Sequence, residues 1–304
     1  MDGDNMKLVT ASYSGVPFIG AYLQEKNVVL NVTRAAEENG HPLPETMIEA
    51  IKLGARFLQQ VEALIAQHEQ SLLFTYGIED PDLEWLAPIP RPTKNIYCVG
   101  KNYREHAVEL GSEADIPEHV MLFSKAPTAV IGHKARIPRH ASITDELDYE
   151  GELAIVIGKE GKGITKDEAL HYVFGYTIIN DVTARDLQKK HKQFLLGKSL
   201  DGSCPMGPCI VPKEYLHSEE GIQLTTTVNG EVRQSGNTRD LIFSIPEIIE
   251  TLSKGTTLEV GDIIATGTPA GVGKGFVPPK LLQVGDTIEI TIEGIGTLRN
   301  EVGQ

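Results

Sequence analysis

The stretch that decides the fold is Asp148-Tyr149-Glu150-Gly151-Glu152-Leu153-Ala154-Ile155-Val156-Ile157-Gly158. It predicts a β-strand with two acidic residues at its start. Successive side chains of a strand alternate between faces, so Glu150 and Glu152 share a face, and both faces are apolar beyond them. A strand that is apolar on both faces is typical of a sheet covered on both sides. For an isolated acidic pair, a solvated strand edge is the simpler interpretation, because acidic residues are mostly exposed.

A third acidic residue stands at the end of a second apolar strand. The run Val173–Ile179 is followed by Asn180 and Asp181. If the two strands are neighbours, the carboxylates of Glu150, Glu152 and Asp181 converge, and three buried anions repel one another unless a cation binds. Ligation by oxygen alone selects a hard ion such as Mg²⁺ or Mn²⁺, with Ca²⁺ as a further candidate.

Composition limits the function classes. The chain has 304 residues, 40% of them hydrophobic, which is enough for a sizeable core. A formal net charge of −14 argues against nucleic acid or an anionic membrane as a partner. Three cysteines form no CxxC pair and no even set, so we expect reduced thiols. No signal peptide or membrane span is recognisable, and we expect a cytoplasmic protein.

The pattern along the chain predicts a mixed α/β, β-rich protein in two parts. Residues 1–85 are expected to form a small α+β N-terminal domain, and residues 86–304 a catalytic domain, with the proline-bearing run Ala87–Pro92 as the linker. The elements expected in the first part are strands at Lys7–Tyr13, Pro17–Tyr22 and Asn27–Asn31 and one helix near Glu45–His68. In the last third, the pattern predicts a hairpin turning at Asn229-Gly230, a helix over Ile245–Ser253, and two similar Gly-Asp turns at Gly261 and Gly285.

A short helix over Asn102–Gly111 carries a candidate base. Asn102 is the expected N-cap, with Glu105 three residues on as in a capping box. His106 and Glu109 are spaced i, i+3 on one face, close enough for the carboxylate to orient the imidazole. A surface His-Glu pair is the alternative interpretation.

Further candidates lie downstream of Asp181. A helical turn starting there would place Arg185 and Gln188 on the same side, where Arg185 could bind a substrate carboxylate or pair with an acidic residue of the protein. Lys198, taken alone, is simplest as a solvated lysine. The run Thr266–Gly275 lacks both the GxxxxGK[ST] and the GxGxxG spacing, but its backbone amides and the Thr268 hydroxyl could approach an anionic ligand.

Taken together, these motifs resemble the fumarylacetoacetate hydrolase family from about residue 92 to the end. Residues 1–85 are similar to the extra N-terminal domain of its longer bacterial members. The motifs are Gly100-x-Asn102-Tyr103-x-x-His106-x-x-Glu109, Tyr149-Glu150-Gly151-Glu152-Leu153, Gly175-Tyr176, Asn180-Asp181-x-Thr183-Ala184-Arg185-Asp186-x-Gln188, Lys198-Ser199-x-Asp201-Gly202, Val228-Asn229-Gly230 and Thr266-Gly267-Thr268-Pro269-x-Gly271-Val272-Gly273.

The resemblance implies a mixed β-sandwich roll, a homodimer and a Mg²⁺ or Mn²⁺ ion. It implies roles for ten residues: Glu150, Glu152 and Asp181 as metal ligands, His106 and Glu109 as a catalytic dyad on a mobile lid helix, Lys198 as a catalytic cation, and Arg185, Gln188, Thr268 and Tyr103 as substrate contacts.

The reaction that this resemblance first suggests is hydrolysis of a C–C bond in a diketo acid, an acylpyruvate or a fumarylacetoacetate-like compound, through a metal-stabilised enolate and a water activated by His106. The alternative is an oxaloacetate decarboxylase or tautomerase, or an isomerase of the 2-hydroxyhepta-2,4-diene-1,7-dioate type, since each needs the same metal, cation and base. A non-catalytic metal-binding regulatory protein is a third hypothesis of another class.

Overall fold

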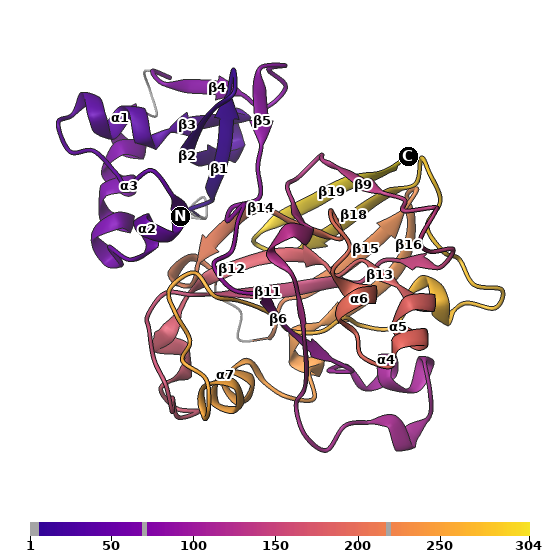
Figure 1. Cartoon of the computed structure of the whole chain (residues 1–304). Coiled ribbons are helices and arrows are strands. Elements are labelled where there is room, and N and C mark those ends of the chain that lie inside the picture. Colours follow the sequence, from indigo (N-terminus) through magenta and orange to yellow (C-terminus); the bar gives the residue numbers. More distant parts are fainter. Residues whose placement is uncertain (1–5, 69–71, 217–219) are drawn as a thin grey trace.

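The computed structural model describes residues 6–68, 72–216 and 220–304 (Figure 1). Its largest element is a 12-stranded sheet. The strands of this sheet are β1 (Leu8–Tyr13), β2 (Val16–Leu23), β3 (Val28–Asn31), β4 (Thr75–Gly77), β5 (Leu83–Trp85), β6 (Ile96–Gly100), β7 (Met121–Lys125), β8 (Val130–Ile131), β11 (Gly151–Ile157), β12 (Val173–Asn180), β14 (Cys204–Pro212) and β17 (Ile263–Ala265). Their order is β4-β3-β2-β1-β14-β12-β11-β17-β6-β7, with β5 paired to β1 and β8 to β14.

A second, five-stranded sheet covers one face of β11 and β12. Its order is β16-β15-β18-β19-β9. The strands are β9 (Arg136–Pro138), β15 (Gln223–Val228), β16 (Glu231–Asn237), β18 (Thr287–Ile292) and β19 (Gly296–Gly303). Leu153, Ile155 and Ile157 of β11 share one core with this sheet, whereas Ala154 and Val156 belong to a second core. The prediction of a strand buried on both faces, within a β-rich sandwich, is therefore confirmed.

The helices lie around these sheets. They are α1 (Val32–Glu38), α2 (Met47–Ile51), α3 (Ala55–His68), α4 (Arg104–Glu109), α5 (Arg185–His191), α6 (Leu195–Lys198) and α7 (Ile245–Ser253). The single helix expected near Glu45–His68 was wrong, because the chain breaks between α2 and α3, where Gly54 has φ +58°. Glycine adopts this left-handed conformation without the steric cost that other residues incur. The helix predicted over Ile245–Ser253 is confirmed with the same bounds.

The N-terminal strands and helices stand at one end of the molecule, at the upper left of Figure 1. Their sheet is continuous with the large one, since β1 pairs with β14 through Leu8 and Ile210. The proline-bearing run after β5 is partly packed, because Ala87 and Ile89 are buried and Thr10 Oγ1 donates to the Pro88 carbonyl at 2.7 Å, whereas Pro90 and Arg91 are exposed. Division into domains at residues 85 and 86 stays a prediction.

Two local turn predictions are confirmed in detail. Asn229 and Gly230 both have positive φ and join β15 to β16. The Gly-Asp turns before β17 and β18 are built alike, since Asp262 accepts from the Glu259 amide at 2.8 Å and Asp286 from the Gln283 amide at 2.7 Å. The three cysteines are free and buried.

Candidate metal centre and active site

Three buried carboxylates converge where β11 begins and β12 ends. The strands pair antiparallel with Gly151 opposite Asn180, so Glu150 and Glu152 of the first strand meet Asp181 after the second. Glu150 also donates its amide to Asn180 Oδ1 at 3.0 Å. One carboxylate oxygen from each of the three acidic residues lies within 4.8 Å of the others. The convergence inferred from two strand ends is therefore present in the structure.

Basic side chains surround two of these carboxylates. Lys198 Nζ lies 2.7 Å from Glu150 Oε2 and 2.8 Å from Asp181 Oδ2, and Arg185 Nη2 lies 2.7 Å from Glu150 Oε1. Lys125, which is fully buried, places its Nζ 2.8 Å from Asp181 Oδ1. The Arg185–Glu150 and Lys125–Asp181 contacts are close ion pairs whose angles fall outside hydrogen-bond geometry. Glu150 and Asp181 thus each have two cationic neighbours.

The ion pairs oppose the effect of burial on the pKa values of Glu150 and Lys198. Burial would raise the pKa of Glu150, but Lys198 and then Arg185 hold it well below its usual range. Burial would lower the pKa of Lys198, but the Asp181 and Glu150 carboxylates raise it above its ordinary value. Lys198 is therefore a permanent cation inside the site and not the solvated lysine that its sequence context alone favours.

Glu152 differs from its two neighbours. Within the described residues it forms no ion pair, and its Oε2 accepts from the Gly267 amide at 2.8 Å. Burial, reinforced by the Asp181 and Glu150 carboxylates, raises the pKa of Glu152 well above its usual range. A buried carboxylate that lacks a cation beside two others is the feature that a bound ion would satisfy. The all-oxygen donor set therefore fits a hard divalent ion.

The glycine-rich run after β17 organises these carboxylates. The Gly267 amide donates to Glu152, the Gly271 amide to Glu109 Oε1 at 2.9 Å, and the Gly273 amide to Asp148 Oδ1 at 2.7 Å. The expectation that these amides approach an anionic ligand was wrong for these three groups, because carboxylates of the protein itself occupy them.

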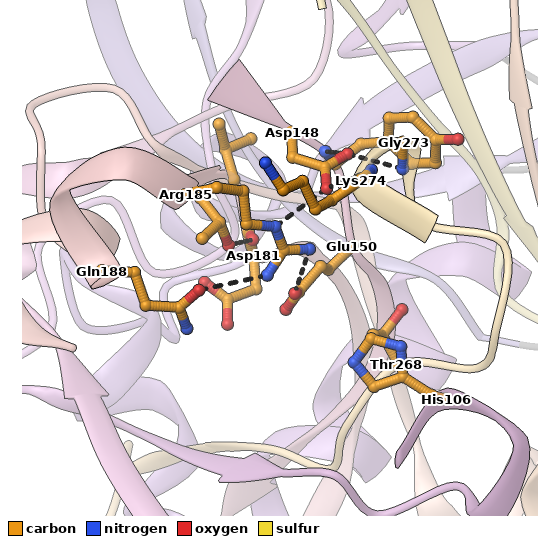
Figure 2. A network of polar contacts seen from close by, with 12 residues as sticks. His106, Asp148, Glu150, Asp181, Arg185, Gln188, Thr268, Gly273 and Lys274 are labelled. Atoms are coloured by element: carbon orange, nitrogen blue, oxygen red, sulfur yellow. Dashed lines mark hydrogen bonds and ion pairs between the residues drawn. The ribbon is translucent and has the colours of Figure 1, made fainter. Parts of the chain in front are cut away.

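The candidate base lies on α4. His106 is buried, and its Nδ1 lies 3.3 Å from Glu109 Oε2. Because Nδ1 faces Glu109, Nε2 is the ring nitrogen left for the cavity, which His106 lines with Thr268 (Figure 2). The expected N-cap was wrong: Tyr103 is the cap residue, and the Asn102 side chain instead donates to the Thr266 carbonyl at 2.8 Å. Tertiary partners outcompete the local capping box here.

Arg185 lies between Asp148 and Glu150 (Figure 2). Its Nε donates to Asp148 Oδ2 at 2.8 Å, and its Nη1 to Gln188 Oε1 at 3.4 Å. Helix α5 begins at Arg185, after β13 (Thr183–Ala184) pairs with β10 (Leu147–Asp148), and not at Asp181 as the sequence suggested. Of the two interpretations of Arg185, the pairing with acidic residues of the protein is the one seen.

The remaining candidates differ in access to the site. Thr268 lines the cavity, but its hydroxyl donates to the Gly151 carbonyl at 2.9 Å and accepts from Gln234 Nε2 at 2.7 Å. Tyr103 is buried and is not among the cavity-lining residues. Burial and, to a smaller extent, the nearby Glu152 carboxylate raise the pKa of the Tyr103 hydroxyl.

Two residues of this network escaped the sequence analysis. Lys125 ends β7, and its sequence neighbours give no sign that it reaches Asp181. Asp148 precedes the acidic pair in the sequence and was assigned no role, yet it is fully buried and accepts hydrogen bonds from Arg185, Gly273 and Lys274. A charged residue beside a buried apolar run was the one available signal for Asp148.

A cavity of about 770 Å³ opens above the carboxylates, within the usual range for small-molecule sites. Glu150, Glu152, Lys198, His106, Gln188 and Thr268 are among its lining residues. The elements α4, α5 and α6 stand around it, grouped at the lower right of Figure 1.

Comparison with known proteins agrees with this architecture. Residues 95–303 match the family model described as fumarylacetoacetate (FAA) hydrolase C-terminal. The chain belongs to the fumarylacetoacetate hydrolase family. No helix in the described part of the chain is both long and apolar enough to span a membrane.

Full-length relatives of this family member carry several names. An oxaloacetate tautomerase, YisK of Bacillus subtilis (strain 168), is 51% identical over 304 residues, covering 98% of this chain and 100% of the relative. A fumarylacetoacetate hydrolase from Exiguobacterium antarcticum is 42% identical, with a TM-score of 0.81 over 98% of this chain and 99% of that one. A 2-hydroxyhepta-2,4-diene-1,7-dioate isomerase from Mycobacterium marinum is 31% identical, with a TM-score of 0.72 over 98% of both chains. These names span hydrolase and isomerase chemistry on one fold.

Proposed function

We propose that this family member is a metal-dependent tautomerase that interconverts the keto and enol forms of a 2-oxo dicarboxylate, with oxaloacetate as the lead substrate. The observation that carries the proposal is the placement of one base and one permanent cation, His106 and Lys198, in the lining of one cavity beside the three carboxylates. The similarity to a protein named oxaloacetate tautomerase supports it. Tautomerase was the alternative reaction at the sequence level and now takes precedence over C–C hydrolysis.

The proposed site roles follow the geometry. Glu150, Glu152 and Asp181 would hold Mg²⁺ or Mn²⁺, and when bound such an ion would supply Lewis-acid polarisation of the 2-oxo group. Lys125 and Lys198 each pair with one oxygen of Asp181, which would fix the orientation of this carboxylate.

Proton transfer is assigned to His106. Its Nε2 takes a proton from C3 of the keto acid, while Glu109 fixes the ring through Nδ1. Lys198, held as a cation, stabilises the charge that develops on the 2-oxo oxygen. The C3–H bond breaks, and His106 gives the same proton back at the 2-oxo oxygen, where an O–H bond forms, so the reaction consumes neither water nor a second reactant.

Substrate contacts are proposed for Gln188 and Thr268 at the cavity wall. Arg185 would act by holding Glu150, and Tyr103 as the buried N-cap residue of α4, in place of the direct substrate contacts that the family resemblance implies. We also propose that the protein is a cytoplasmic homodimer, a localisation with which three free, buried cysteines are compatible.

Hydrolysis of a diketo acid is the second candidate. The His106–Glu109 pair could equally activate a water, and the cavity volume of about 770 Å³ leaves room for a second carbonyl group. The same dyad therefore serves either reaction, and the substrate decides between them.

The test follows oxaloacetate and acetylpyruvate with the Mn²⁺-loaded protein. We expect rapid loss of the enol absorbance of freshly dissolved oxaloacetate, without matching pyruvate release, and slow or no cleavage of acetylpyruvate. His106→Asn should reduce the tautomerisation rate about 10²–10⁴-fold, the usual contribution of a general base. His41→Asn, an exposed histidine far along the sequence from α4, is the matched control. Fast acetylpyruvate cleavage with no acceleration of tautomerisation would replace the proposal with the hydrolase.

A further inference from the structure

The cavity lining is basic although the protein is acidic. The whole chain has a net charge of −14, yet seven lining residues are Lys or Arg and four are Asp or Glu. The basic ones are Lys101, Arg185, Lys189, Lys190, Lys192, Lys198 and Lys274. An excess of positive charge in a cleft attracts anions, and it does so most effectively where the walls are of low dielectric constant.

Four of these cations already have partners in the protein. Arg185 and Lys198 pair with the site carboxylates, as described above. Lys274 Nζ lies 2.8 Å from Glu146, and Lys101 Nζ lies 3.2 Å from Asp115. Their charge is therefore largely compensated by neighbouring carboxylates.

Lys189, Lys190 and Lys192 are different. All three are exposed, and none of their ammonium groups makes a hydrogen bond or an ion pair within the described residues. Asp186, at i−3 and i−4 from Lys189 and Lys190, is the obvious intrahelical partner. Its carboxylate is instead occupied by the Thr144 hydroxyl at 2.5 Å and by the Asp145 amide at 3.1 Å.

Helix α5 connects these lysines to the metal centre. Arg185, Gln188 and Lys189 are spaced i, i+3 and i+4, so they lie on one face of the helix. With a rise of 1.5 Å per residue, Lys189 lies about 6 Å along the axis from Arg185. Lys192 is the C-cap residue directly after the helix. The face thus runs from the Glu150 carboxylate outwards to the rim of the cavity.

A simpler explanation is that lysines at the end of a helix stabilise its dipole. That effect needs no cavity, whereas all three lysines line the cavity that Glu150 and Glu152 also line. The chain also turns at Lys192 with φ +59°, a left-handed conformation that costs about 1–2 kcal/mol for a residue other than glycine. This turn returns the chain to Phe194, which also lines the cavity.

We propose that Lys189, Lys190 and Lys192 form a second anion subsite, which binds the distal carboxylate of the substrate and makes the enzyme select 2-oxo dicarboxylates over 2-oxo monocarboxylates. The subsite rests on the proposed function only in that the 2-oxo end of the substrate lies at the three carboxylates. Exposed ammonium groups discriminate by charge more than by shape, so selectivity depends on the second negative charge and falls with ionic strength.

The experiment compares two stable ligands of equal chain length, 2-oxoglutarate and 2-oxopentanoate, which differ in the distal carboxylate. Binding to the Mn²⁺-loaded protein is measured by calorimetry for wild type and for the triple variant Lys189→Gln, Lys190→Gln, Lys192→Gln. The control triple variant, Lys52→Gln, Lys162→Gln, Lys254→Gln, makes the same change of net charge at exposed lysines that do not line the cavity.

We expect the Kd of 2-oxoglutarate to rise about tenfold in the first variant, which is about 1.4 kcal/mol, with less than a twofold change for 2-oxopentanoate. The control variant should match wild type for both ligands. For oxaloacetate turnover, the loss should fall on KM more than on kcat. Equal weakening of both ligands, or no weakening of either, would overturn the subsite.

The outcomes separate the two proposals. A wild-type protein that does not accelerate oxaloacetate tautomerisation contradicts the proposed function but leaves the ligand comparison intact. A protein that tautomerises oxaloacetate yet shows unchanged discrimination in the first variant contradicts the subsite alone.

Discussion

The replacement Asp148→Asn tests whether a single buried carboxylate holds the site together. Asp148 is fully buried, and its oxygens accept from Arg185 Nε at 2.8 Å and from the amides of Gly273 and Lys274 at 2.7 and 3.0 Å. Asparagine has nearly the same shape but only one accepting oxygen. Its amide nitrogen would face the Arg185 and Lys274 donors that Asp148 Oδ2 now accepts from.

The magnitude follows from these contacts. A buried donor left without an acceptor costs about 1–3 kcal/mol, and here two donors lose theirs. Breaking a buried ion pair by removing one partner costs about 3–5 kcal/mol. This cost is not added to the cost of the lost acceptors, because the loss at Arg185 is counted in both. We therefore expect the free energy of unfolding to fall by about 3–5 kcal/mol. At about 2 °C per kcal/mol for a protein of this size, Tm should fall by about 6–10 °C.

The assay is thermal unfolding of the metal-free protein followed by circular dichroism. Asp240→Asn is the matched control, since Asp240 is exposed and the same atoms change; its Tm should stay within about 1 °C of wild type. An Asp148→Asn variant that melts within about 2 °C of wild type would refute the reasoning that Asp148 is a required partner of Arg185.

Two further predictions concern pH and metal. Burial, and to a lesser degree Lys134 and Arg299, lowers the pKa of His133 to about 4. In the unfolded chain the pKa of this imidazole is near 6.5, so the unfolded state binds the proton more readily. The free energy of unfolding is therefore full above about pH 6.5 and falls by about 2–3 kcal/mol as the pH drops towards 4. His133→Asn should remove this part of the acid destabilisation in urea unfolding at two pH values, and an equal loss in both proteins would contradict the assignment. Burial and two acidic neighbours raise the pKa of Glu152, so keeping this carboxylate ionised near neutral pH lowers the stability of the folded protein. Glu152→Gln should therefore raise the Tm of the metal-free protein. The same variant should lose most of the Tm increase that Mn²⁺ gives wild type, and an undiminished Mn²⁺ effect would remove Glu152 from the ligand set.

The carboxylate cluster was predictable from the sequence because strands have a strict period of two. Glu150 and Glu152 must share a face, and Asp181 ends the next apolar run, so pairing of the two strands suffices to bring all three together. The sequence signals for the hairpin at Asn229-Gly230 and for helix α7 are local. Each depends on spacing or turn chemistry within about ten residues.

Features that depend on distant partners were not predictable. Lys125 is the last residue of a partly exposed strand, and only the pairing of β6 with β7 and of β6 with β17 carries it to Asp181. Asn102 fits a capping box locally, but contacts with Thr266 and Phe243 take its side chain away. One glycine, Gly54, decided whether the N-terminal helical pattern was continuous.

The glycine-rich run couples parts of the site that the sequence analysis treated separately. Its amides hold Glu152 in the carboxylate cluster, Glu109 behind the candidate base, and Asp148 behind Arg185. A side chain would not fit at Gly271, where an added Cβ would lie 1.8 Å from the Arg233 carbonyl oxygen, or at Gly275, where it would lie 2.2 Å from Glu109 Oε1. Gly275 therefore permits a close approach of the backbone to the Glu109 carboxylate, and Gly271 permits a close approach to the Arg233 backbone. Any movement of this run would shift the candidate base and a candidate metal ligand together, which is the arrangement expected of a site whose closure assembles its chemistry.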